Sequence, residues 1–363
     1  MTSESAPRPA LWKSRSFQLV LGLCVSIACL WWAAGDLISK PKERDQFVNA
    51  FRMADYRFLP LLLGMLFSFY TLKAYRWKLL LTPLGEFRTF GDCFGPMLSG
   101  FAVNNVLPAR AGEIVRAMVF ARRTSQPLAS VLATIALERI FDMICVLVLL
   151  SAGLLSLPDM GEGMRSKAIG MGIVVAVGVA GAATFIVWTP AVLRLINWGL
   201  ALIRVPEQLR ERIRHLLETA ATGLASVKSP TRLALIAVVS LLQWTLNGAM
   251  MYLSLQSFGV DVPIAAAMVL LGVVALGVAV PASPGFFGVI QLCFTKTLQI
   301  FPVSQPAVLA ASIYYHMIQY IPVTLLGLLW LSRSGFQLRE SSVLSLQSSV
   351  RPVSSPSPLT TDN

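Results

Sequence analysis

The chain has 363 residues, of which 55% are hydrophobic and 13% charged, and its formal net charge is +12. Soluble domains carry about 25% charged residues, so this composition argues against an ordinary soluble domain and indicates a polytopic membrane protein. Five cysteines without a CxxC or Cys/His spacing give no basis for a disulfide framework or a zinc site, and the Lys and Arg excess, lacking a basic-aromatic module, favours cytoplasmic loops beside anionic lipid over nucleic-acid binding.

Six apolar segments are long enough to cross a bilayer as helices. The first, Phe17–Ala34, follows a polar N-terminus (residues 1–16) and lacks a clean A-x-A site, which favours an uncleaved span over a signal peptide. The other five predicted spans are Phe58–Leu81, Leu128–Leu157, Ala168–Trp188, Leu233–Leu255 and Ala307–Leu331. Residues 333–363 are rich in Ser and Pro and are expected to form a disordered tail after a membrane domain over 17–332.

Amphipathic segments lie between these spans. Asp36–Arg57 carries both charge signs and a few apolar residues, which predicts either a helix at the interface or a surface helix that merely connects spans. Pro190–Lys228 is basic and amphipathic, as expected for a helix pair on the cytoplasmic surface. At the end of the second span, Lys73, Arg76 and Trp77 share a helix face that we expect near the headgroups.

Two apolar segments are too broken to be ordinary spans. Residues 90–121 contain the polar stretch NNVLPARAGEIVR (104–116), and residues 264–300 are interrupted by PASPGFFG (281–288). Charged and helix-breaking residues are costly among lipid tails unless they meet partners, water or a ligand. A hairpin that enters the membrane and returns on the same side explains each interruption.

The two broken segments are similar to each other. L-P-A-x-x-G at 107–112 matches V-P-A-x-x-G at 280–285, and a Gln-Pro pair precedes both the third span (126–127) and the sixth (305–306). Three crossings separate the copies, so a duplication predicts an inverted repeat, although so short a pattern can also arise by chance. When the loops are sorted by this topology, one side of the membrane receives 21 Lys and Arg and the other receives 8. This difference predicts that both termini of this cell-membrane protein lie in the cytoplasm.

The third span carries the charged sequence ERIFD. Glu138 and Asp142 are one helical turn apart, and Arg139 is three residues from Asp142. Each isolated charge at mid-bilayer costs roughly 2.5–3.5 kcal/mol, so these groups must pair or line water. They either neutralise Arg110, Glu113 and Arg116 and hold the first hairpin in place, or leave Arg110 or Arg116 to bind an anionic headgroup.

Other polar residues admit two interpretations. If a half-helix begins at Gly285, its amides form an anion site. His316 is either a proton relay or a hydrogen-bonded structural histidine, and the structural role is favoured. Gln243 and Asn247 are expected to form hydrogen bonds between helices rather than to bind a ligand.

These motifs resemble a known family. N-N-x-L-P-A-R-x-G-E-x-x-R, E-R-x-x-D and P-x-S-P-G-x-x-G look like the flippase-like transmembrane domain of the lysylphosphatidylglycerol synthase/flippase family, over about residues 15–332. Single-domain relatives are mostly uncharacterised, and some are linked to polyprenyl-lipid glycosylation. The residues that fall on the family pattern are Asn105, Pro108, Arg110, Gly112, Glu113, Arg116, Glu138, Arg139, Asp142, Pro281, Pro284, Gly285 and Gly288.

Two departures limit what the resemblance implies. Only some thirty residues follow the last span, so lipid aminoacylation is not expected of this chain. Gln291 stands where relatives often have an acidic residue after the second motif, so no role of such a carboxylate is carried over.

The sequence therefore predicts an all-α membrane protein of six spans plus two oppositely oriented re-entrant helical hairpins. We expect a flippase that moves an anionic phospholipid or polyprenyl phosphate between leaflets, without cofactor or metal; a membrane-embedded transferase using a lipid-phosphate donor is the alternative, and a scaffold that only recruits partners is a third. The expected substrate-binding residues are Asn105, Arg110, Glu113, Arg116, Glu138, Arg139, Asp142 and Gly285, and the structural ones are Pro108, Gly112, Pro281, Pro284 and Gly288.

Overall fold

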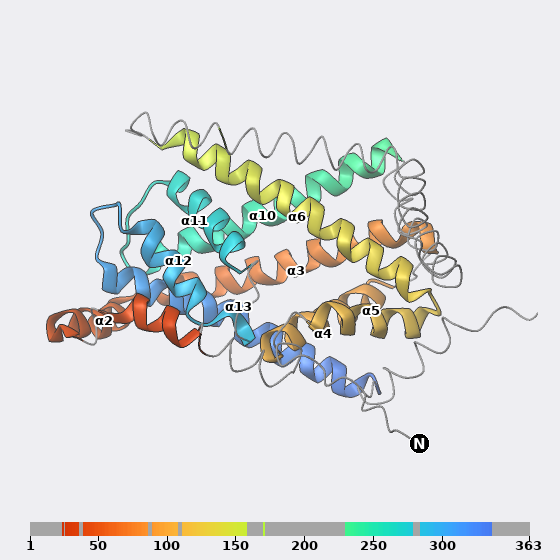
Figure 1. The fold of residues 1–363 in the computed structure, drawn as a ribbon, viewed down its shortest axis with the longest axis horizontal. Coiled ribbons are helices and arrows are strands. Elements are labelled where there is room, and N and C mark those ends of the chain that lie inside the picture. The colour runs from red at the N-terminus through yellow and green to blue at the C-terminus, as the bar shows by residue number, and fades with distance from the viewer. Residues whose placement is uncertain are drawn as a thin grey trace, which may run out of the picture.

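The computed structural model describes residues 24, 26–35, 39–85, 89–107, 111–157, 170, 229–278 and 284–335. These residues form helices, short 3-10 turns and connecting segments, with no strand among them, which confirms the prediction of an all-α fold for the described part of the chain (Figure 1). Predictions for the N-terminus, the fourth span, the surface helices at 190–228 and the tail after residue 335 lie outside the described residues.

Among the described residues, four long helices form the framework. They are α3 (Leu59–Leu81), α6 (Leu128–Ser156), α10 (Pro230–Ser257) and α13 (Gln305–Arg333). Each matches a predicted span to within a few residues. Two helical stretches, Tyr56–Leu84 and Pro230–Ser257, are long and apolar enough to cross a membrane by length and composition.

Two pairs of shorter helices stand where the broken segments were predicted. The first pair is α4 (Gly91–Val106) and α5 (Ala111–Thr124), and the second is α11 (Ile264–Gly277) and α12 (Val289–Leu298). A 3-10 turn, η5 (Pro284–Phe286), lies in the second interruption. The helix breaks are therefore confirmed, while entry and return on one side of a membrane stays a prediction.

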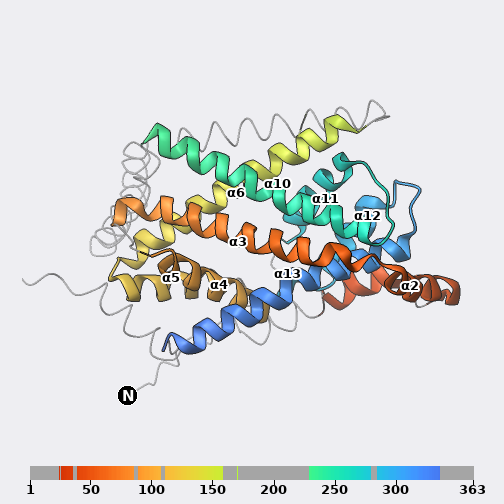
Figure 2. The ribbon, with the colours of Figure 1, turned by 180° about the vertical axis from the view of Figure 1, so that it is seen from behind.

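The helices pack in an exchanged pattern between two halves of the chain, the first half comprising α3 to α6 and the second half α10 to α13. The first helix of each broken pair packs on the last long helix of the other half, α4 on α13 and α11 on α6. The long helices α3 and α10 lie side by side between these contacts, as the front and rear views both show (Figures 1 and 2). Each half of the chain thus holds the first helix of the other half's broken pair, while α5 and α12 pack on α6 and α13 of their own halves.

Glycines allow the closest of these approaches. A side chain on Gly112 would overlap the carbonyl oxygen of Gly100 and the side chain of Asn104, so α4 and α5 are in backbone contact there. Gly327 of α13 lies against the backbone of Leu98 in the same way. Within the first broken pair, α4 is consequently packed closely on two sides, by α5 and by α13.

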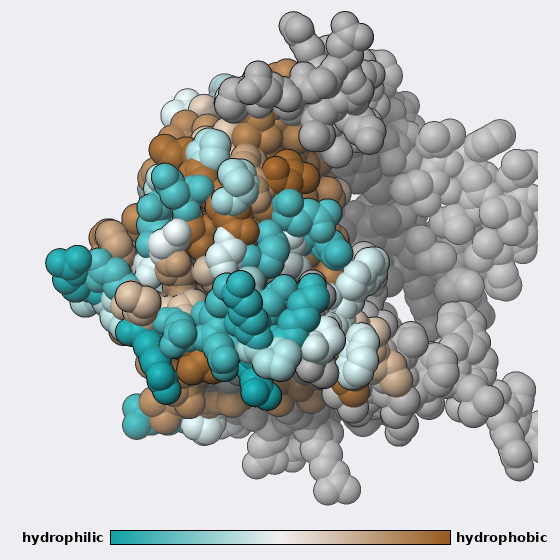
Figure 3. All heavy atoms as spheres, turned by 90° about the vertical axis from the view of Figure 1, so that its left-hand side faces the viewer, coloured by the Kyte–Doolittle hydropathy of each residue, from teal (hydrophilic) through white to brown (hydrophobic). Residues whose placement is uncertain are grey.

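One end of the molecule is polar. The helix α2 (Pro41–Met53), which contains no buried residue, and the turn η2 (Tyr56–Phe58) lie at this end. Figure 3 looks onto it and shows hydrophilic residues gathered over the lower part of the face, with hydrophobic residues above. A helix in the predicted surface segment 36–57 is thereby confirmed, and Phe51 joins it to the core through an edge contact with Phe258, ring centroids 5.2 Å apart.

The described part of the first predicted span is also helical. Residues Ser26–Gly35 form a short apolar helix. The hydroxyl of Ser26 donates a hydrogen bond to the carbonyl oxygen of Phe287, and the Lys296 ammonium lies 5.0 Å from the Trp32 ring centroid. This helix therefore packs beside the second helix break.

Candidate functional site

A cluster of buried charged side chains joins α3, α5 and α6. Two carboxylates stand at its centre, Glu138 and Asp142 on α6, with side-chain exposures of 0% and 6%. Cations surround them from three helices: Lys73 and Arg76 on α3, Arg116 on α5, and Arg139 on α6. So many ionised groups remain buried only because they pair with one another.

The shortest ion pairs involve the two deepest arginines. Arg76 Nη1 lies 2.7 Å from Asp142 Oδ1, and Arg116 Nη2 lies 2.7 Å from Glu138 Oε2. The guanidinium of Arg116 also stacks 3.7 Å from the ring centroid of Trp77, a cation–π contact. Each central carboxylate thus has one close arginine.

Lys73 and Arg139 make longer contacts with the same carboxylates. The Lys73 ammonium is 3.3 Å from both Glu138 and Asp142. Arg139 is 3.4 Å from Glu138, 3.5 Å from Asp142 and 3.4 Å from Glu113. Arg139 is also the most exposed cation of the cluster, at 32% of its side chain.

A cavity of about 240 Å³ opens beside this cluster. Both broken pairs and all four long helices contribute to its wall, so it lies where the two halves of the chain meet. Lys73, Glu113 and Arg139 are the charged residues among its described lining. Arg76 and Arg116 lie behind the wall, outside that lining.

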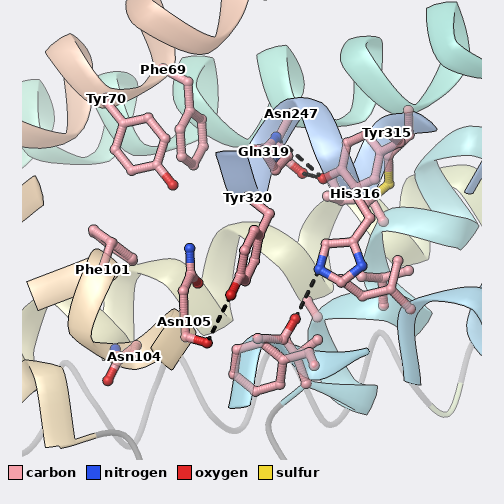
Figure 4. A pocket seen from close by; sticks show the side chains of 18 of the residues that line it. Phe69, Tyr70, Phe101, Asn104, Asn105, Asn247, Tyr315, His316, Gln319 and Tyr320 are labelled. Atoms are coloured by element: carbon pink, nitrogen blue, oxygen red, sulfur yellow. Dashed lines mark hydrogen bonds between the residues drawn. The ribbon is translucent and has the colours of Figure 1, made fainter. Parts of the chain in front are cut away.

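Part of the described cavity lining is polar and uncharged (Figure 4). The Tyr315 hydroxyl donates to Asn247 Oδ1 at 3.1 Å, and Gln319 Nε2 lies 3.5 Å from the same hydroxyl. The Tyr320 hydroxyl reaches the carbonyl oxygen of Asn105 at 3.4 Å. Amides and phenols from α4, α10 and α13 therefore line the same cavity as the charged residues.

A closed set of hydrogen bonds fixes the second helix break. The Gly288 N–H donates to Gln291 Oε1 at 2.8 Å, Gln291 Nε2 lies 3.2 Å from His316 Nδ1, and His316 Nε2 lies 2.8 Å from the Gly285 carbonyl oxygen. Because that carbonyl can only accept, His316 carries its proton on Nε2 and accepts from Gln291 on Nδ1. These contacts place His316 in the structural role favoured from sequence.

The break differs in one respect from the prediction. The half-helix begins at Val289, after Gly288, and not at Gly285, so the predicted start is wrong. Gly285 and Gly288 have φ angles of 68° and 85°, which glycine adopts without strain. Since Gln291 accepts from the Gly288 amide, that amide is not free for an anion.

The structure distributes the predicted site residues over three places. Glu113, Arg139, Asn105 and Gly285 line the cavity. Arg116, Glu138 and Asp142 form the buried cluster behind it, where Arg116 is 2% exposed. Pro108, Arg110 and Pro281 lie outside the described residues.

The predicted structural residues and amides also find places. Gly112 provides the close approach of α5 to α4, and its N–H donates to Asn104 Oδ1 at 2.8 Å. Asn247 makes the expected bond between helices, whereas buried Gln243 has no hydrogen-bond partner among the described residues. The interhelical prediction is therefore confirmed for Asn247 and wrong for Gln243.

Sequence reasoning missed the partners of Lys73 and Arg76. Their position near the headgroups stays a prediction, and the structure shows that they are 3% and 0% exposed and pair with α6. The available signal was the match between two bases three residues apart on α3 and two acids four residues apart on α6. Trp244, whose indole N–H donates to Asp142 Oδ1 at 2.8 Å, was missed as well.

Comparisons with known proteins identify a family of membrane proteins. The model of the lysylphosphatidylglycerol synthase TM region matches residues 19–327. Glycosyltransferase AglD of Haloferax volcanii is 27% identical over 290 residues, 70% of this chain and 45% of AglD, so the match spans less than half of that relative. No solved structure matches.

Two archaeal relatives match along most of their own length. A UPF0104 membrane protein of Methanocaldococcus jannaschii is 23% identical over 233 residues, 62% of this chain and 91% of that protein. A UPF0104 membrane protein of Methanothermobacter thermautotrophicus is 23% identical over 329 residues, 88% of this chain and 96% of that protein. The chain belongs to the family of membrane proteins defined by the lysylphosphatidylglycerol synthase TM region.

Proposed function

We propose that this protein moves an anionic lipid between the leaflets of the cell membrane, with the headgroup passing through the central cavity. Membership of a lipid-associated membrane family supports a lipid-related role. The position of the cavity, between two broken helix pairs in an exchanged packing, is typical of transporters built as inverted repeats. In this proposal the pairs are re-entrant hairpins that open to opposite sides, and both termini are cytoplasmic.

The observation that carries the proposal is the distribution of charge. Among the described residues the cluster holds four cations and three carboxylates, counting Glu113. Arg76 and Arg116 lie closest to the two central carboxylates, at 2.7 Å each, and both are outside the cavity lining. Two cations and one carboxylate then face the cavity, which leaves one positive charge for an anion.

Arg139 is the residue we assign to the headgroup phosphate. Its guanidinium is the most exposed of the cluster and has only long contacts, 3.4–3.5 Å, to its carboxylate partners. A planar guanidinium binds a phosphate through two parallel hydrogen bonds. Arg116 becomes a positioning residue in this proposal, and the predicted role of Arg110 remains untested.

Glu113 has a second role in the proposal. It is 27% exposed, lines the cavity and lies 3.4 Å from Arg139. A headgroup phosphate would replace it as the partner of Arg139, and its return would release the lipid. Because Glu113 and the phosphate compete for the same guanidinium, Arg139 binds the anion and can also release it.

Leaflet-resolved transport in proteoliposomes tests the proposal. Purified protein is reconstituted with fluorescent phosphatidylglycerol, and the outer leaflet is bleached with dithionite. Losing the charged hydrogen bonds of Arg139 removes roughly 1.5–3 kcal/mol of binding, so Arg139→Ala should slow movement about tenfold or more. Arg139→Lys should restore part of the rate, because Lys keeps the charge without the planar geometry.

Arg333→Ala is the matched control, since Arg333 is exposed at the end of α13 and away from the cavity. Equal rates for wild type and Arg139→Ala, with both proteins folded, would remove the assigned role. Lipid movement no faster than in protein-free vesicles would remove the proposed function.

A membrane-embedded transferase is the second candidate, because the relative AglD is named a glycosyltransferase. The cavity then holds a lipid-phosphate donor rather than a lipid in transit. Transfer of a radiolabelled sugar from a lipid donor by the pure protein would favour this function over transport.

A further inference from the structure

The ammonium group of Lys73 is enclosed by aromatic rings. It lies 5.5 Å from the ring centroid of Phe101, 5.8 Å from Phe69 and 5.9 Å from Trp244. These rings come from three different helices, α3, α4 and α10, and all three residues line the cavity. We call Phe69, Phe101 and Trp244 the aromatic cage.

Two carboxylates complete the surroundings of this ammonium. Glu138 and Asp142 each lie 3.3 Å from Lys73 Nζ. The Trp244 indole N–H donates to Asp142 Oδ1 at 2.8 Å, so one cage ring is fixed to one of the carboxylates. Aromatic faces together with carboxylates form the environment in which proteins bind alkylammonium ligands.

Such a site at a cavity wall would suit the amine of a zwitterionic headgroup. Here it is filled by the chain itself, because the Lys73 side chain is 3% exposed and its ammonium takes the place a ligand amine would take. From this occupancy we propose that Lys73 is a specificity-determining residue that excludes amine-bearing headgroups. This inference rests on the proposed function and names its substrate class.

The rest of the cavity is consistent with an uncharged group beyond the phosphate. The carboxylate that lines it, Glu113, lies 3.4 Å from Arg139. The amides and phenols of Asn105, Asn247, Gln319 and Tyr320 line the same cavity. These groups hydrogen-bond to hydroxyls, so the headgroup that fits them is a phosphate that carries a polyol.

Charge counting gives the consequence of removing Lys73. The described cluster has four cations and three carboxylates with Lys73, and three of each without it. Without Lys73 the charges of the cluster are equal in number and the aromatic cage is empty. The cavity then no longer favours an anion and instead fits a headgroup that has its own ammonium group. Lys73→Ala should therefore exchange one lipid preference for the other.

The test compares fluorescent phosphatidylglycerol with fluorescent phosphatidylethanolamine in the same proteoliposome assay. Wild type should move phosphatidylglycerol at least tenfold faster, and Lys73→Ala should reduce or reverse that ratio by about tenfold. Lys78→Ala, on the same helix and away from the cavity, is the control and should keep the wild-type ratio. An unchanged ratio in Lys73→Ala, or a wild type that moves both lipids equally, would overturn the inference.

A binding measurement separates this inference from the proposed function. Ethylammonium should raise the unfolding temperature of Lys73→Ala in detergent in a saturable way, and should leave wild type and Lys78→Ala unchanged. No selective stabilisation would overturn the cage assignment. If neither lipid moves in wild type, the proposed function fails, while selective ethylammonium binding would still support the cage.

Discussion

The two halves of this protein share a packing scheme but not a chemistry. In the first half, α3, α5 and α6 are joined by ion pairs at 2.7–3.4 Å. In the second, α10, α12 and α13 are joined by neutral hydrogen bonds through Asn247, Gln291, Tyr315 and His316. Helix packing can thus be held by charge in one half of the chain and by amide, phenol and imidazole groups in the other.

This difference indicates a division of roles across the cavity. The charged half supplies the groups that select an anion, and the neutral half supplies a wall with hydrogen-bonding groups and no charge of its own. Removing any member of a buried ion cluster costs much folding free energy, whereas removing one neutral hydrogen bond costs less. Stability should therefore depend more steeply on the first half.

Glu138→Gln should have the largest effect. It removes the negative charge that faces Arg116 at 2.7 Å and Arg76 and Lys73 at 3.3 Å, leaving buried cations uncompensated. Breaking a buried pair in this way costs roughly 3–5 kcal/mol. Thermal unfolding in detergent should show a large drop, and Glu113→Gln, at a 27% exposed position, should show a small one.

Gly112→Ala should come next and contrasts the two broken pairs directly. The added methyl would meet the backbone of Gly100 and Asn104, which cannot move aside, so the cost should reach the upper end of about 1–3 kcal/mol. At Gly277 the methyl would meet the Cys293 sulfur at 2.7 Å, the end of a side chain that can rotate. Gly277→Ala should therefore unfold close to wild type; equal losses would contradict the contrast.

Gln291→Leu probes the neutral half. It leaves the Gly288 N–H without its acceptor and His316 Nδ1 without its donor, at a cost of roughly 1–3 kcal/mol. Hydrogen exchange of the α12 amides should accelerate near residue 288. Gln299→Leu, exposed at the other end of α12, should leave exchange unchanged.

Tyr315→Phe should have the smallest effect of the series. It removes two neutral hydrogen bonds, the one that the hydroxyl donates to Asn247 at 3.1 Å and the long one that it accepts from Gln319 at 3.5 Å, and keeps the ring contact with Phe294. We expect a loss of roughly 0.5–1.5 kcal/mol in unfolding free energy. Tyr75→Phe, at a 41% exposed position, is the control. A loss of unfolding free energy for Tyr315→Phe as large as for Glu138→Gln would contradict the proposed difference between the two halves.

Much of the fold could be read from the sequence because apolar length and helix breakers are local signals. The positions of α3, α6, α10 and α13 followed from hydropathy, and both interruptions followed from Pro and Gly. The start of α12 was missed because Gly285 and Gly288 are equally suited to a break, and only the Gln291 side chain decides between them.

The site was less predictable because it depends on which helices are neighbours. Glu138 and Asp142 were identified from their cost in a membrane. Arg116, the closest partner of Glu138, was among the predicted partners, whereas Arg76, the closest partner of Asp142, was not. Lys73 and Arg76 belong to a helix whose end reads equally well as a headgroup anchor, and only the packing of α3 against α6 shows that they are buried. Long-range pairing of this kind leaves no trace in local periodicity.

The reciprocal clasp, α4 on α13 and α11 on α6, has a consequence for how the chain can be assembled. Each half needs a helix of the other half to cover its own buried surface, so the two halves resemble the subunits of an interlocked dimer that are joined in one chain. Two fragments that divide the chain between the halves should be degraded when produced separately, and should recover a single folded particle when produced together.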